Sequence, residues 1–86
     1  MPTSAFHYVY ILRDKASHTH YYVGHTRDLQ ERLTRHNSGR VPHTSAHAPW
    51  EIHSAIAVHS LEIAQELEHY FKSHSGREWM RRHLEQ

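Results

Sequence analysis

The pattern of hydrophobic and polar positions begins with two strand-like runs. Residues 6–12, FHYVYIL, are aromatic or branched on both alternating faces, which is typical of a strand inside a sheet. Residues 20–24, HYYVG, resume this character after a polar, turn-like segment. The two runs therefore predict an antiparallel hairpin with a longish loop. We expect Gly24 to break the second strand.

The next periodic segment has the spacing of a helix. Apolar residues recur at helical intervals from about Arg27 to Asn37. Thr26 is predicted as the N-cap, and Asp28 would lie in the first turn, where the helix dipole favours a negative charge. Residues 37–49 contain a glycine, two prolines and several hydroxyl side chains, so we expect a loop there.

A third strand is predicted over residues 50–59, WEIHSAIAVH. Its alternation places four apolar side chains on one face: Trp50, Ile52, Ile56 and Val58. Ser60 is then expected to cap a helix over about residues 61–73, and Gly76 to separate it from a short final helix. The predicted fold is α+β, one domain over residues 1–86 with the order β-β-α-β-α-α, in which helices flank a small three-stranded antiparallel sheet.

Composition narrows the function classes. The 86 residues include no cysteine, which excludes a disulfide framework and a thiolate metal site. No apolar run approaches the roughly 20 residues that span a bilayer, so we expect a cytoplasmic protein with no membrane partner. The formal net charge is only +1, but residues 32–50 carry arginines and histidines and no carboxylate. Such a segment can face phosphate groups.

Polar side chains interrupt the apolar faces of both long helices. At about 100° per residue, Arg32 and His36 share the arc of the first helix's two leucines. The simplest interpretation is that Arg32 lays its aliphatic stem over the edge of the core and His36 caps a carbonyl group. On the second helix, Glu68 lies at the rim of the apolar face, where it could pair at i,i+4 with Lys72.

Two tyrosines complete a possible site. The alternation of the first two strands can aim Tyr10 and Tyr22 at the same side of the sheet. Each tyrosine alone is expected to be structural, with its hydroxyl satisfied at the edge of the sheet. Together with the guanidinium, imidazole and carboxylate on adjoining elements, however, the phenols supply the parts of a phosphodiester-cleaving site.

In such a site each group has an expected role. Glu68 would hold a hard divalent cation such as Mg²⁺, which keeps several waters and binds substrate phosphate. Arg32 would stabilise the charge that develops on the phosphoryl oxygens. Tyr10 would deprotonate the nucleophile, for which its pKa, ordinarily ~10, has to be lowered by nearby positive charge. Arg13 is the candidate for that charge.

The same residues carry a resemblance to a known family. The segments YVY (8–10), YVG (22–24), LQERLTRH (29–36) and AQELEHYFK (64–72) resemble, in this order and spacing, the GIY-YIG nuclease domain. The resemblance covers roughly residues 6–79. It is greatest for the small stand-alone bacterial members related to the nuclease domain of the excinuclease C subunit.

The resemblance implies a metal-dependent DNA endonuclease with one Mg²⁺ or Mn²⁺ ion in its site. The residues at the positions of the two motif tyrosines, the helix pair and the metal ligand are Tyr10, Tyr22, Arg32, His36 and Glu68. Among them, Tyr10 corresponds to the family's general base. Arg13 stands where related domains often have lysine, which suggests a similar role for it.

The sequence also departs from the family pattern. Tyr8 stands where the family name has glycine, and His25 is an uncommon neighbour of the motif glycine. Many active members have an asparagine near the end of the domain, but the only asparagine here is Asn37. The phosphate contact made by the family's terminal asparagine is therefore missing here or is replaced by a cation of the last helix: Arg77, Arg81 or His83. Larger members choose a target with a second DNA-binding domain, so here a protein partner could supply specificity.

Three functions are compatible with the sequence. The first is an endonuclease that cuts DNA by hydrolysis with one divalent metal ion, and the second is a non-catalytic nucleic-acid-binding module of the same fold. The basic residues expected to contact nucleic acid are Arg35, Arg40, Arg77 and Arg81. The third is a histidine-rich metal-binding or pH-responsive protein, suggested by four loop residues: His18, His20, His43 and His47. Scattered, solvated histidines are the simpler explanation for these.

Overall fold

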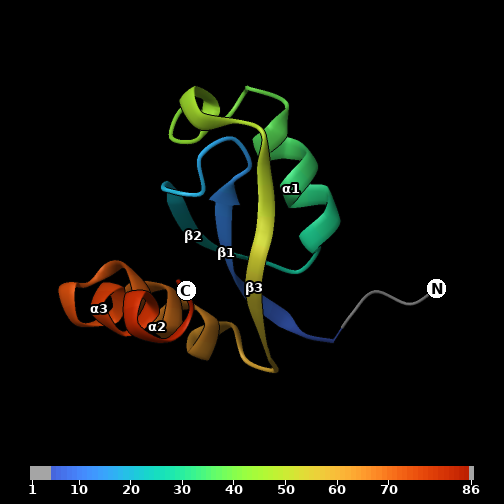
Figure 1. Ribbon diagram of the computed structural model, residues 1–86. Helices are drawn as coiled ribbons and strands as arrows, with labels where there is room; N and C mark the ends of the chain where they lie inside the picture. Colours follow the sequence, from blue (N-terminus) through green and yellow to red (C-terminus); the bar gives the residue numbers. More distant parts are fainter. Residues whose placement is uncertain (1–4, 86) are drawn as a thin grey trace.

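The computed structural model describes residues 5–85, so the ends of the predicted domain lie outside the described residues. The elements in chain order are β1 (His7–Asp14), β2 (Tyr21–Thr26), α1 (Leu29–Asn37), a short 3-10 helix η1 (Ser45–His47), β3 (Trp50–Val58), α2 (Leu61–Lys72) and α3 (His74–His83), as Figure 1 shows. The strands form one antiparallel sheet in the order β2-β1-β3. The predicted α+β fold and its order of elements are confirmed.

The sheet separates two layers of helix. Helix α1 packs on one face, and α2 and α3 pack on the other (Figure 1). Strand β1 contributes to both layers, because Val9 and Ile11 join the apolar cluster under α2 and α3, whereas Tyr10 and Leu12 join the cluster under α1. We refer to these two sides as the α2–α3 face and the α1 face. The central position of β1 explains why its residues are apolar on both sides.

The predicted hairpin with a longish loop is present, and Asp14 fixes that loop. Its carboxylate accepts hydrogen bonds from the backbone N–H groups of Ser17, Thr19 and His20 at 2.8, 2.9 and 2.8 Å, and from the Ser17 hydroxyl at 2.6 Å. The Ser17 hydroxyl and then the backbone donors hold the pKa of Asp14 well below its usual range, although burial opposes them. The loop is therefore organised around one ionised side chain.

Gly24 does not end β2, contrary to the prediction. The strand continues to Thr26, and Gly24 is paired with Tyr10 of β1. A Cβ atom at position 24 would lie 2.4 Å from the hydroxyl oxygen of Tyr10 and 2.6 Å from its Cζ. The glycine is therefore needed because the Tyr10 ring lies against the β2 backbone, and not because the chain turns there.

Two helix boundaries also differ from the predictions. Asp28, not Thr26, is the N-cap of α1, and its carboxylate accepts a backbone hydrogen bond from the first turn at 3.0 Å. Ser73, not Gly76, separates the last two helices, because it both ends α2 and caps α3. Gly76 is buried in the first turn of α3, where a Cβ atom would lie 1.8 Å from the carbonyl oxygen of Tyr70.

A one-residue bulge divides β3 between Ile52 and Ser54. The bulge reverses the alternation of the side chains, so Trp50 and Ile52 pack on the α1 face, whereas Val58 packs on the α2–α3 face. Ile56 is 39% exposed. The prediction that these apolar side chains share one face is therefore wrong.

Helix α2 begins where the sequence predicts. The Ser60 side chain accepts a hydrogen bond from the backbone N–H of Ile63 at 3.3 Å. Within the predicted apolar face of this helix, Ala64, Leu67 and Phe71 join the apolar cluster, but Ile63 is 49% exposed. The buried stripe of α2 is thus narrower than its sequence indicates.

Candidate active site

A chain of buried polar groups connects the sheet to α1 and the following loop. The Tyr10 hydroxyl lies 2.9 Å from Nε2 of His36, and Nδ1 of His36 lies 2.9 Å from the Thr44 hydroxyl. The three residues are 2%, 3% and 0% exposed, respectively. The interpretation that His36 caps a carbonyl group is therefore wrong, because both of its ring nitrogens bind side-chain hydroxyls.

Burial sets the protonation state of His36. Burial, together with the positive charges of Arg32 and Arg35, lowers the pKa of His36, so the ring is neutral at pH 7. The Thr44 hydroxyl is also placed to donate to a backbone carbonyl of its own loop at 3.5 Å. We therefore assign the imidazole proton to Nδ1, which donates to Thr44. Nε2 is then the acceptor for the Tyr10 hydroxyl.

Tyr10 is held as a neutral phenol in this arrangement. Burial raises the pKa of Tyr10 to about 12, although the neighbouring Arg32 guanidinium opposes this effect. The expectation that Arg13 lowers this pKa is wrong, because Arg13 binds Glu51 at 2.6 Å. Side chains three positions apart in a strand point to opposite faces, so Arg13 lies on the other side of β1 from Tyr10.

Arg32 has an unused donor beside this buried chain. Its Nε is buried and finds no hydrogen-bond acceptor among residues 5–85. Leaving a buried donor unsatisfied costs about 1–3 kcal/mol, and a guanidinium remains charged at any ordinary pH. The interpretation that Arg32 only lays its stem over the core edge does not account for this donor. A phosphate oxygen is a suitable acceptor for it.

Tyr22 lies where the two faces meet at the β2 edge of the sheet. Like Tyr10 it belongs to the cluster of the α1 face, as the alternation of the strands predicts. Its ring centroid is 5.1 Å from that of His36. Nζ of Lys72, which comes from α2, lies 5.5 Å from the centroid of the Tyr22 ring. Tyr22 thus connects the buried polar chain to the groups on α2.

Glu68 reaches this edge from α2. Its Oε1 is in contact with Nδ1 of His25, and its Oε2 accepts a hydrogen bond from Nζ of Lys72 at 2.7 Å. Burial raises the pKa of Glu68, but the hydrogen bonds from Lys72 and His25 together outweigh burial and hold the pKa below its ordinary value. The carboxylate is therefore ionised. The i,i+4 pair with Lys72 is confirmed, whereas the only sequence signal for His25 is its unusual place beside Gly24.

Comparison with known proteins identifies the family. Residues 6–83 match the sequence profile of the GIY-YIG catalytic domain. The chain belongs to the GIY-YIG family. It is similar to a UPF0213 protein of Bacillus pumilus, 37% identical over 68 residues (78% of this chain and 67% of that protein), and to a UPF0213 protein of Bacillus licheniformis, 33% identical over 67 residues (77% and 67%). The predicted resemblance to small stand-alone bacterial members is confirmed.

GIY-YIG catalytic domains are nuclease domains and generally depend on a divalent metal ion. In this chain the available donors are the ionised Glu68 and the imidazole of His25. Residues 5–85 contain no group of three or more His, Asp or Glu side chains that could hold a metal ion. One carboxylate suits a hard cation that keeps most of its waters and shares phosphate oxygens, rather than a closed zinc site. The residues present therefore fit the metal that the family implies.

The loop histidines do not assemble the metal site suggested by their spacing. His20 stacks on His47, with ring centroids 3.7 Å apart and an interplanar angle of 14°. Rings stacked face to face do not aim their nitrogen lone pairs at one ion. His18 lies 3.6 Å from Glu51, and His43 is exposed. No observation within the described range therefore favours a histidine-rich metal site over solvated histidines.

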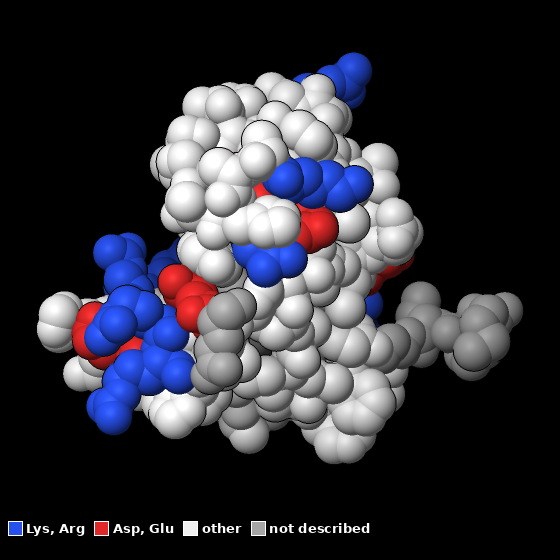
Figure 2. All heavy atoms as spheres, viewed as in Figure 1, with Lys and Arg blue, Asp and Glu red and all other residues white. Residues whose placement is uncertain are grey.

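Two of the predicted phosphate-contacting arginines border the candidate site. Arg77 and Arg81 line a hollow between β2 and α3 that also includes Tyr22 and Lys72. In Figure 2, lysine and arginine side chains gather over the α2–α3 end of the molecule. Arg81 also pairs with Glu78 at 2.9 Å. These cations are therefore placed beside the motif tyrosine of β2.

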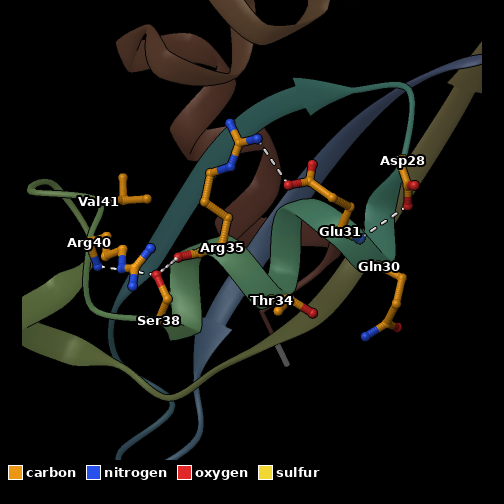
Figure 3. Close-up of a pocket in the computed structure, with 8 residues that line it drawn as sticks. All are labelled: Asp28, Gln30, Glu31, Thr34, Arg35, Ser38, Arg40 and Val41. Atoms are coloured by element: carbon orange, nitrogen blue, oxygen red, sulfur yellow. Dashed lines mark hydrogen bonds and ion pairs between the residues drawn. The ribbon is translucent and has the colours of Figure 1, made fainter.

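The other two predicted arginines lie on the outer side of α1 (Figure 3). Arg35 forms an ion pair with Glu31 at 2.9 Å, and the backbone N–H of Arg40 binds the Ser38 hydroxyl at 3.2 Å. They line a separate hollow that includes Asp28 but not Tyr10, Tyr22, Arg32, His36 or Glu68. The structure thus brings Arg77 and Arg81 next to Tyr22, whereas Arg35 lies on the solvated face of α1 and Arg40 in the loop after this helix.

Asn37 has a structural role. Its Nδ2 donates to the carbonyl of Trp50 at 3.0 Å, and its Oδ1 accepts the backbone N–H of the same residue. The indole N–H of Trp50 in turn donates to the carbonyl of Thr44 at 2.8 Å. The end of α1, the start of β3 and the loop that supplies Thr44 are thereby joined, which positions the buried polar chain.

Proposed function

We propose that this protein is a metal-dependent endonuclease that hydrolyses phosphodiester bonds of DNA. The observation that carries the proposal is the buried chain from Tyr10 through His36 to Thr44, beside an Arg32 donor with no acceptor among the described residues. A purely structural tyrosine needs one hydrogen-bond partner. Here Tyr10 and His36 form a path for a proton, and this path lies beside the Arg32 guanidinium, which is suited to bind phosphate.

Tyr10 is the proposed general base. A pKa of about 12 makes a free phenolate costly, so the two proton transfers are concerted. The attacking water passes a proton to the Tyr10 oxygen while the Tyr10 proton passes to Nε2 of His36 over 2.9 Å. The resulting imidazolium keeps its Nδ1 proton on Thr44 and returns the extra proton through Tyr10 to solvent after the phosphodiester bond has broken.

The remaining groups bind and stabilise the phosphate. Arg32 donates to the phosphoryl oxygens and stabilises the negative charge that develops there. Glu68 would hold the Mg²⁺ or Mn²⁺ ion, which would polarise the phosphate and acidify a bound water. The Lys72 ammonium lies beside this carboxylate on Oε2, so its positive charge would oppose a cation held by Glu68.

The DNA backbone has a proposed path along the α2–α3 end of the molecule. Arg77 and Arg81 are placed to contact phosphates that flank the cleaved bond, because they line the hollow shared with Tyr22. Arg35 and Arg40 would contact DNA only if it also passes the outer side of α1. We also propose that a protein partner supplies the choice of DNA target.

A nicking assay tests this function. Supercoiled and branched DNA are incubated with the protein and Mg²⁺ or Mn²⁺. Glu68→Ala and Tyr10→Phe should each abolish nicking while circular dichroism shows a folded protein. Matched controls are Glu66→Ala and Tyr70→Phe, which alter the same residue types at exposed positions of α2 and should nick as the wild type does. Nicking that survives Glu68→Ala would contradict the proposal.

The second candidate function is a non-catalytic nucleic-acid-binding module. It is favoured by the occupation of both Glu68 oxygens by His25 and Lys72. This function predicts DNA binding that weakens on Arg35→Gln or Arg40→Gln. The slope of the logarithm of the binding constant against the logarithm of the salt concentration should become shallower by about 1 for each phosphate that the variant no longer neutralises. Fluorescence anisotropy over a salt series measures both effects. Metal-dependent nicking by the wild type would eliminate this alternative.

A further inference from the structure

His25 is the partner of Glu68 that the proposed mechanism does not use. It lies on β2 next to the motif glycine, and alternation places it on the same side of the strand as Val23, which packs on the α2–α3 face. Its Nδ1 is therefore directed at α2, where it contacts Oε1 of Glu68. The two donor atoms come from different elements and converge on one point.

We propose that His25 is a second protein ligand of the divalent cation, with Nδ1 of His25 and Oε1 of Glu68 bound to the same ion. For this, the hydrogen that lies between Nδ1 and Oε1 would move through solvent to Nε2, so that Nδ1 would present its lone pair to the ion. The inference rests on the proposed function, because it uses Glu68 as the first ligand. It adds His25 to the ligand Glu68 that the family resemblance already implies.

The surroundings of the pair suit a bound ion. The side chains of His25 and Glu68 are 32% and 21% exposed, so a hydrated ion can reach them from solvent. A hollow of about 590 Å³ beside His25 is also lined by Arg32. An ion held by His25 and Glu68 would therefore adjoin the place where Arg32 can bind a phosphate.

The ligand set determines which metal is preferred. Carboxylate and water suit both Mg²⁺ and Mn²⁺, whereas imidazole suits first-row transition metals such as Zn, Cu, Fe and Ni. Mn²⁺, as a first-row transition metal, accepts an imidazole nitrogen more readily than Mg²⁺ does. A site with His25 should therefore favour Mn²⁺ over Mg²⁺ more strongly than a site with Glu68 alone. Loss of an outer-shell partner that only orients a ligand costs about 10-fold or more in metal affinity. Removing a direct ligand should therefore reduce Mn²⁺ affinity by at least that factor and should change Mg²⁺ affinity much less.

Metal binding without DNA tests the inference. Mn²⁺ is titrated into wild-type protein and into His25→Ala, Glu68→Ala and His69→Ala, the last being a matched control at an exposed histidine of α2. We expect the dissociation constant to rise by about 10-fold or more in His25→Ala, binding to be lost in Glu68→Ala, and the control to be unchanged. Pulsed EPR of bound Mn²⁺ should show ¹⁴N coupling in the wild type and the control but not in His25→Ala.

A further variant separates ligation from orientation. The amide of His25→Gln can still donate a hydrogen bond to Glu68 but supplies no imidazole nitrogen. Affinity in His25→Gln does not decide the inference, because the Gln side-chain oxygen can itself bind Mn²⁺. Bound Mn²⁺ without ¹⁴N coupling in the wild type, or unchanged imidazole ¹⁴N coupling in His25→Gln, overturns it. If Glu68→Ala still abolishes Mn²⁺ binding and nicking in that case, the proposed function stands. Mn²⁺ binding that Glu68→Ala does not reduce overturns both.

Discussion

The two faces of the sheet bury different kinds of side chain, although β1 contributes to both. Among the described residues, the apolar cluster buried on the α2–α3 face consists of Val9, Ile11, Val23, Ala64, Phe71 and Met80. The α1 face buries Tyr10 and Trp50 together with the polar side chains of His36 and Thr44. The interior of the first face therefore stabilises the fold mainly by apolar burial, with the His25–Glu68 pair at its edge, whereas the interior of the second holds a chain of polar groups.

The polar groups of the α1 face show where function departs from packing. A buried polar group is costly unless it is hydrogen-bonded, and Tyr10, His36 and Thr44 satisfy one another. The exception among the described residues is Nε of Arg32. A fold optimised for stability alone would not leave such a donor unsatisfied, so the difference between the two faces points to a ligand on the α1 face.

The largest loss of stability is expected from Gly76→Ala, which disturbs the packing of the α2–α3 face. The new Cβ would lie 1.8 Å from a backbone oxygen that a side-chain movement cannot relieve. We expect a loss of about 3 kcal/mol in the free energy of unfolding, measured by urea denaturation. Gly39→Ala is the control, since position 39 has open space and a φ of 79°, and should cost only about 1 kcal/mol. Equal losses in the two variants would refute the packing explanation.

Gly24→Ala tests the α1 face in the same way. The added Cβ would overlap the hydroxyl and Cζ of Tyr10, so we expect a loss of about 2 kcal/mol. Because Tyr10→Leu removes both overlapping atoms, Gly24→Ala should cost much less in a Tyr10→Leu background. A double-mutant cycle of unfolding free energies measures this coupling. Additive losses would show that Gly24 serves some purpose other than room for Tyr10.

High pH should weaken the α1 face selectively. The pKa of Tyr10 is raised from an unfolded value near 10 to about 12 in the folded protein, so its stabilising effect is complete below pH 10 and is lost as pH rises through 12. The loss should reach about 1.4 kcal/mol at pH 11. Tyr10→Phe removes this contribution, so its stability should fall less than that of the wild type between pH 9 and 11. Parallel pH profiles would contradict the assignment.

The smallest effect on stability is expected at the rim where the two faces meet. Lys72 is 44% exposed in its i,i+4 pair with Glu68, so Lys72→Met should change the free energy of unfolding by about 0.5 kcal/mol or less. It also removes a positive charge on Oε2 of Glu68 that opposes a cation bound to the same carboxylate. Mn²⁺ should therefore bind several-fold more tightly to Lys72→Met than to the wild type, by direct titration. Weaker binding would mean that the charge of Lys72 does not oppose the ion.

The order of elements, the fold class and much of the candidate site were predictable from local sequence. Strand alternation placed Tyr10 and Tyr22 on one side, and helical periodicity placed Arg32 and His36 beside the leucines of α1. The same rules, applied without knowledge of the bulge, gave the wrong face for the end of β3. Periodicity is a property of neighbouring residues, so it fails where one inserted residue shifts the register.

Sequence by itself determined which chemical groups this protein has and which elements carry them. Only the tertiary structure decided their partners: Tyr10 with His36, 26 positions apart, and His25 with Glu68, 43 positions apart. It also showed that Gly24 gives room to a phenol ring and that Arg13 lies on the wrong face to act on Tyr10. Such pairings depend on the packing of strands and helices far apart in the chain, which no local pattern records.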